Sequence, residues 1–135
     1  MEFKDRLKEK RRILGLSQEE LAKKAGVTGR TVQNYELGTR TPQNIEIVQK
    51  LAIALDTTVE YLLGNEGILV VEAHERGGAK SARDINALVS ELTGLFAGGE
   101  IDEEEKDGIM AALNQAYWIS KENNKKYTPK KHRKS

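Results

Sequence analysis

The segment from residue 26 to 38, GVTGRTVQNYELG, holds three side chains suited to reading the edges of DNA bases. Arg30 can donate two hydrogen bonds to guanine, and Gln33 and Asn34 can each donate to and accept from adenine. Polar side chains also cover ordinary surface helices, so this chemistry alone does not establish a DNA contact. The elements that position these three residues decide between the two interpretations.

A short helix and a tight turn precede the polar side chains. Ser17 and Glu20 form a capping-box pattern, in which the serine hydroxyl accepts from the Glu20 amide and the Glu20 side chain reaches back. The helix that they open ends at Gly26, which suits a left-handed residue. About three residues later Thr28 caps the next helix, expected at about 28–36. Two short helices joined so tightly are typical of a helix-turn-helix.

The second of these helices has a clear inward face. Val32 and Tyr35 are three residues apart and therefore lie on the same side. At about 100° per residue, Arg30, Gln33 and Asn34 are distributed around the opposite side. The polar set is predicted to face outward.

A further helix is predicted from Phe3 to Leu14, because Phe3, Leu7 and Leu14 fall on one stripe. Arg11 lies on that same stripe, between Leu7 and Leu14. A charge on a buried face needs a partner.

Two more helices complete this part of the chain. After a loop over residues 37–42, apolar residues spaced for one face predict a fourth helix from about Ile45 to Leu55. Thr57 and Glu60 predict a second capping box and a short fifth helix that stops at Gly64. Five helices within residues 1–64 predict one compact unit.

The remainder of the chain is predicted to be a linker, a hairpin and a tail. Residues 65–79 are expected to be a linker, in which Ile68–Val71 could form a short strand. Two amphipathic helices over residues 80–123 predict a hairpin too small for a core of its own. A partner is therefore implied, either the N-terminal domain or, preferably, a second copy. Residues 124–135 are basic and nearly free of apolar residues, which predicts a flexible tail.

Composition narrows the compartment and the possible partners. The 135 residues include no Cys and no apolar run long enough to cross a bilayer, so we expect a cytoplasmic protein without a membrane contact. The formal net charge of +1 hides three different segments. Residues 1–64 hold 11 Lys/Arg and 9 Asp/Glu, residues 65–123 hold 5 and 12, and residues 124–135 hold 6 and none. A polyanion would therefore contact the first segment or the tail.

The N-terminal part resembles the helix-turn-helix of phage repressors and Cro proteins, the XRE family, over residues 3–64. The similarity covers SQEELAKKAGVTGRTVQNYELGTRTP and the closing residues YLLG at 61–64. More loosely, YWISKENNKKYTPKKHRK at 117–134 resembles repressors on mobile elements of Gram-positive bacteria. The resemblance implies an all-α fold, with a five-helix lambda-repressor-like DNA-binding domain followed by the C-terminal helical hairpin.

The resemblance also assigns roles to individual residues. It implies that the helix at 28–36 enters the major groove, that the amide end of the helix at Gln18 anchors a phosphate, and that the loop at Thr39 and Arg40 grips the backbone. It pairs Arg11 with Glu36. Gly29 departs from the longer polar residue often found at its position. The DNA-contacting set that follows is Gln18, Thr28, Gly29, Arg30, Gln33, Asn34, Thr39 and Arg40.

The function expected from these features is a sequence-specific transcriptional regulator, most simply a homodimeric repressor on a palindromic operator of double-stranded DNA. An alternative is an antitoxin or other protein-interaction module, with an unidentified protein partner and DNA binding for autoregulation. An enzyme is not expected, because a self-cleaving repressor would need a β-rich domain after Gly64. The acidic run EIDEEEKD is read as a solvated first helical turn, and no cofactor or metal is expected.

Overall fold

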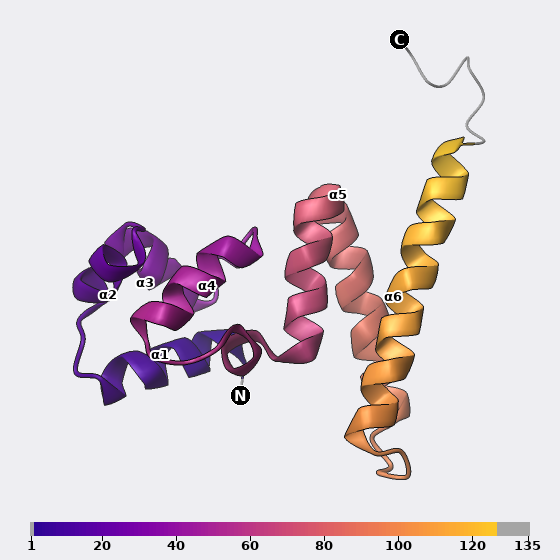
Figure 1. The fold of residues 1–135 in the computed structure, drawn as a ribbon, viewed down its shortest axis with the longest axis horizontal. Coiled ribbons are helices and arrows are strands. Elements are labelled where there is room, and N and C mark those ends of the chain that lie inside the picture. Colours follow the sequence, from indigo (N-terminus) through magenta and orange to yellow (C-terminus); the bar gives the residue numbers. More distant parts are fainter. Residues whose placement is uncertain (1, 127–135) are drawn as a thin grey trace. The chain divides into compact units, whose positions relative to one another are not determined.

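The computed structural model describes residues 2–126, and every regular element in that range is a helix. The all-α prediction is therefore confirmed. Figure 1 shows the elements in chain order. They are α1 (Phe3–Ile13), α2 (Gln18–Ala25), α3 (Gly29–Leu37), α4 (Ile45–Ala54), α5 (Val59–Leu95) and α6 (Glu103–Lys126).

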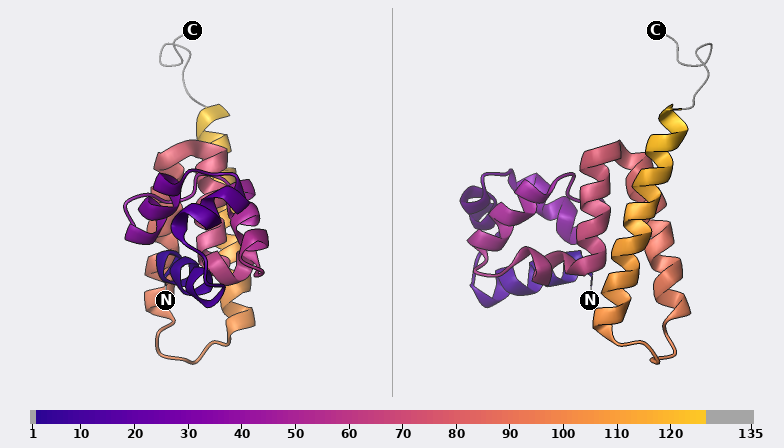
Figure 2. Two further views of the ribbon diagram at one scale, coloured as in Figure 1. Left: turned by 90° about the vertical axis from the view of Figure 1, so that its left-hand side faces the viewer. Right: turned by 45° about the vertical axis from the view of Figure 1, so that its right-hand side comes forward.

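The long element α5 is broken at two glycines. Gly64 has a φ of 72° and Gly78 a φ of 78°, values that only glycine adopts readily. These breaks divide α5 into segments 59–63, 65–77 and 79–95, and Figure 2 shows the reversal of direction at the second break. The chain as a whole divides into two compact units, Met1–Asn86 and Ala87–Ser135.

The first unit is built around one apolar cluster from α1 to the first segment of α5. Leu7, Val32 and Tyr35 are among its buried members, as the stripes in the sequence predicted. The Phe3 ring packs edge-on against the Tyr35 ring, with 5.8 Å between centroids. This packing fixes the inner side of α3 and therefore also its exposed side.

The predicted strand at Ile68–Val71 is wrong, because residues 65–77 form a helical segment. β-branched residues favour strands only weakly, and burial overrides that preference. Val71 and Ala73 are buried in this segment, and Ser81 and Ile85 are buried in the next. Residues 65–79 are thus part of the folded helical structure rather than a linker.

Other boundaries differ by small amounts. Thr58 caps α5 by accepting from the Tyr61 amide at 3.0 Å, so the predicted cap at Thr57 is wrong by one residue. The last helix continues to Lys126, three residues into the predicted tail. The rest of that tail lies outside the described residues.

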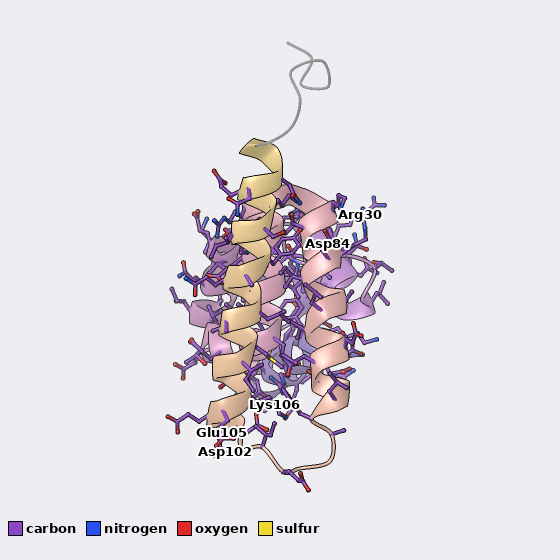
Figure 3. All side chains as sticks on the ribbon, turned by 90° about the vertical axis from the view of Figure 1, so that its right-hand side faces the viewer. Arg30, Asp84, Asp102, Glu105 and Lys106 are labelled. Atoms are coloured by element: carbon purple, nitrogen blue, oxygen red, sulfur yellow. The ribbon has the colours of Figure 1, made fainter. Side chains whose placement is uncertain are left out.

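The second unit confirms the predicted start of its last helix. Asp102 accepts from the Glu105 amide at 2.8 Å, and Figure 3 labels both residues where α6 begins. On α6, Met110 is buried while Ile109 is 39% exposed. The two residues are adjacent and both apolar, so the sequence alone does not show which of them faces inward.

One contact within the first unit joins α4 to residues 65–77. The Glu75 carboxylate accepts a hydrogen bond from the Ile45 amide at 2.9 Å, at the first residue of α4. Asn44 accepts from the Ile47 amide at 2.9 Å. The first turn of α4 is therefore capped from within and from 30 residues away.

Replacing Glu75 with alanine is expected to lower the free energy of unfolding by about 0.5–1 kcal/mol, because a carboxylate at a helix N-terminus contributes about that much. Urea denaturation followed by circular dichroism measures the change. Glu72→Ala, which removes an exposed carboxylate from the same segment, is the matched control. Equal stability of the two variants would show that the Glu75 contact contributes nothing.

Candidate nucleic-acid interface

Local hydrogen bonds cap the starts of α2 and α3. The Ser17 hydroxyl accepts from the Glu20 amide at 3.0 Å, and the Ser17 amide donates to the Glu20 carboxylate at 2.9 Å, which confirms the predicted capping box. Gly26 ends α2 with a φ of 71°. The Thr28 hydroxyl accepts from the Thr31 amide at 3.1 Å and opens α3. These caps determine where α3 begins relative to α2.

An open groove of about 640 Å³ lies between the start of α2 and the exposed side of α3. It brings together five members of the predicted DNA-contacting set. The groove is lined by Ser17, Gln18, Glu19, Gly29, Arg30, Gln33, Asn34 and Leu37. Arg30, which Figure 3 labels, and Gln33 are exposed, whereas Asn34 is half-buried. Donors and acceptors from two helices thus line one surface.

The predicted ion pair between Arg11 and Glu36 is present. The Arg11 Nε and Nη2 atoms donate to the two Glu36 carboxylate oxygens at 2.6 and 2.9 Å, which is a bidentate arrangement. The side chains are only 13% and 3% exposed. Arg11 Nη1 also donates to the Leu16 carbonyl at 2.8 Å, and the Gln18 side chain donates to Glu36 at 3.1 Å. One carboxylate therefore connects α1, α2 and α3.

The environment of Glu36 favours its charged form. Burial acts to raise the pKa of this carboxyl group. Hydrogen bonds from Arg11 and Gln18, together with the charges of Arg11 and Lys8, outweigh burial and hold the pKa below its ordinary value. The hydrogen bond from Arg11 to Glu36 is likewise the largest contribution that raises the pKa of Arg11. Both partners stay ionised near neutral pH.

At the end of α3, two residues of the predicted DNA-contacting set, Asn34 and Thr39, are hydrogen-bonded to each other. The Thr39 hydroxyl lies 3.3 Å from both the backbone and the side-chain carbonyl oxygens of Asn34. The Thr39 amide donates to the Asn34 backbone carbonyl at 3.1 Å. The Asn34 side-chain oxygen is thereby already engaged, and its amide nitrogen is the group left to contact a ligand.

Three predicted residues do not line the groove, although all three are exposed: Thr28, Thr39 and Arg40. Thr28 lies at the turn before α3, and the other two lie in the loop after it. These positions border α3 at its two ends. The predicted contact of Thr28 with base edges or adjacent phosphates, and those of Thr39 and Arg40 with the DNA backbone, remain predictions.

The predicted DNA-contacting set does not include three residues of the groove, Ser17, Glu19 and Leu37. The sequence predicts Ser17 only as a helix cap. Leu37 is 62% exposed and lies seven residues after Arg30, on the same stripe of α3. That spacing was a usable signal. Glu19 had none, because it enters the groove only through its packing beside Gly29 on another helix.

Two features are not found in residues 2–126, a metal-binding cluster and a membrane-spanning helix. Within that range, no group of three or more acidic or histidine side chains could hold a metal ion. Likewise, none of the described helices combines the length and apolar character needed to cross a bilayer.

Comparisons with known proteins agree with this geometry. A family model described as helix-turn-helix matches residues 7–62. The immunity repressor protein of Bacillus phage phi105 is 28% identical over 135 residues, covering 95% of this chain and 93% of the relative. The HTH-type transcriptional regulator ImmR of Bacillus subtilis (strain 168) is 31% identical over 114 residues, covering 84% of this chain and 89% of the relative. No solved structure matches the chain.

The matched residues 7–62 include α2, α3, the turn between them and the groove that they form. The alignment with ImmR covers 84% of this chain, so it extends well beyond residues 7–62 into the C-terminal helices. The chain therefore belongs to the XRE-type helix-turn-helix family of DNA-binding transcriptional regulators.

Proposed function

We propose that the protein is a dimeric repressor that inserts α3 into the major groove of a palindromic operator. The observation that carries this proposal is the groove in which Gln18, Arg30, Gln33 and Asn34 meet. Arg30 and Gln33 are exposed on a helix whose opposite side is buried in the core. The two relatives named above are an immunity repressor and a transcriptional regulator.

The start of α2 supplies a phosphate contact in this proposal. The first amides of a helix have no partner within the helix, and its dipole favours an anion. Gln18 and Glu19 provide two such amides at the edge of the groove. Thr39 and Arg40 would hold the backbone on the other side of α3.

Dimerisation is proposed through residues 80–123. A single helix reads few base pairs, so useful specificity requires two half-sites about one turn of DNA apart. The second unit exposes apolar side chains that a second copy could cover: Leu95 is 75% and Ile119 54% exposed. In this proposal residues 1–64 read the DNA and residues 80–123 join the two copies.

Selection of bound sites from a random DNA library tests the proposal. A palindrome with two short half-sites is expected, and sedimentation equilibrium should give the mass of a dimer. Failure to enrich any motif would refute sequence-specific binding. An enriched motif bound by a monomer would refute only the proposed dimer.

A further inference from the structure

The first residue of α3 has no side chain, and another residue occupies the space that one would take. A Cβ atom at Gly29 would collide with the Glu19 carboxylate, whose carbon lies 2.6 Å from that position. Real Cβ atoms do not approach other atoms so closely, so a side chain at position 29 would force Glu19 to move. Gly29 therefore lets a carboxylate from α2 lie against the start of α3.

Glu19 is not engaged elsewhere in the described structure. The capping box of α2 uses Glu20, whose carboxylate accepts from the Ser17 amide. Among residues 2–126, no hydrogen bond or ion pair involves the Glu19 side chain. An acidic residue in a first helical turn also favours the helix dipole, but that role requires no position in the groove.

The chemistry of the groove changes when Glu19 is included. Of its eight lining residues, Glu19 is the only acid and Arg30 the only base. A carboxylate accepts hydrogen bonds and cannot donate them. In the major groove cytosine presents an amino donor alone, adenine presents a donor beside an acceptor, and guanine and thymine present acceptors to a side chain. A carboxylate at this position therefore favours cytosine and opposes guanine and thymine.

The same carboxylate repels phosphates, so it weakens binding to DNA that offers it no amino group. The Glu19 carboxylate therefore raises the ratio of specific to non-specific affinity more than it raises the affinity for the specific site. Glu19 and Arg30 line the same groove, so one surface presents an acceptor-only group and a donor-only group.

We propose that Glu19, given access by Gly29, is a further base-reading residue that selects cytosine at one position of each half-site. This inference rests on the proposed DNA-reading function of the groove. Gly29 and Glu19 contribute differently: Gly29 provides the space, and Glu19 provides the hydrogen-bond acceptor.

Library selection with the wild type and three variants tests the proposal. The wild type is expected to prefer cytosine at one position that recurs symmetrically in both half-sites. Glu19→Ala should remove that preference, lowering discrimination at this position by about fivefold or more. Glu19→Gln should shift it toward adenine, because an amide both accepts and donates. Gly29→Ala should weaken it at the same position by displacing the carboxylate.

Glu60→Gln is the matched control, since it removes an exposed carboxylate from the same compact unit without touching the groove lining. Circular dichroism verifies that each variant is folded. If the Glu19 variants bind all sequences more tightly by one factor and keep every base preference, Glu19 acts only through its charge and the proposal is wrong. If the wild type enriches no motif, the proposed function itself fails.

Discussion

Replacing Glu36 with alanine is expected to lower the free energy of unfolding by about 3 kcal/mol, the low end for removing one partner of a buried ion pair. The variant leaves the largely covered Arg11 guanidinium without its bidentate acceptor, and it releases the Gln18 side chain. Because Arg11 also holds the Leu16 carbonyl, the turn before α2 should loosen. DNA affinity is also expected to fall, because α2 and α3 are then held less firmly in their relative orientation.

Urea denaturation and DNA titration measure the two effects of Glu36→Ala. Glu46→Ala is the matched control, because it breaks an exposed ion pair with Lys50 at 3.4 Å, and such pairs contribute little. Unchanged stability and unchanged DNA affinity in Glu36→Ala would show that the Arg11 pair has no structural role.

The lowered pKa of Glu36 gives the same pair a defined pH dependence. The unfolded chain binds the proton more tightly than the folded one, so the stabilisation is complete above the ordinary pKa of 4.5 and is lost as the pH falls through the lower folded value. The difference in stability between the wild type and Glu36→Gln should therefore shrink below about pH 4.5. A difference that stays constant down to full protonation would contradict the assignment.

Replacing Gln33 with alanine is expected to weaken binding to the selected operator by roughly tenfold or more while leaving binding to random DNA nearly unchanged. Gln33 is exposed in the middle of α3 and lines the groove. Loss of a base contact removes discrimination, whereas the phosphate contacts that dominate non-specific binding remain.

Two further variants serve as comparisons for Gln33→Ala. Arg40→Ala should weaken binding to all sequences and reduce the salt slope of the binding constant by about 1, as expected for a phosphate contact. Gln49→Ala, at an exposed glutamine of α4, should change neither quantity. Equal losses on operator and random DNA for Gln33→Ala would exclude Gln33 from base reading.

Local signals in the sequence predicted the helix-turn-helix well. The Ser17 and Glu20 capping box, the left-handed Gly26 and the inward Tyr35 each depend on residues within one or two helical turns. Such features follow from hydrogen bonding and side-chain direction alone. The resemblance to known repressors supplied the partner of Arg11, which lies 25 residues away along the chain.

The errors arose where tertiary packing makes the choice. Residues 68–71 have strand preferences but lie in a helical segment with buried side chains. The Glu19 side chain lies in the groove because Gly29, on the next helix, has no side chain that would displace it. The spacing of residues within α2 does not indicate this contact. The hydrogen bond from Thr39 to the Asn34 side-chain oxygen leaves the amide nitrogen of Asn34 for a base, and that base contact stays a prediction.

The hydrogen bond from the Ile45 amide to Glu75 determines how far the chain can be truncated from its C-terminal side without losing a native helix cap. A fragment that ends at Gly64 keeps every residue of the N-terminal apolar cluster. It nevertheless loses the acceptor for the first amide of α4, the helix that follows the loop carrying Thr39 and Arg40. The smallest fragment that preserves the native capping of α4 therefore extends to Glu75, beyond the last residue of the N-terminal apolar cluster.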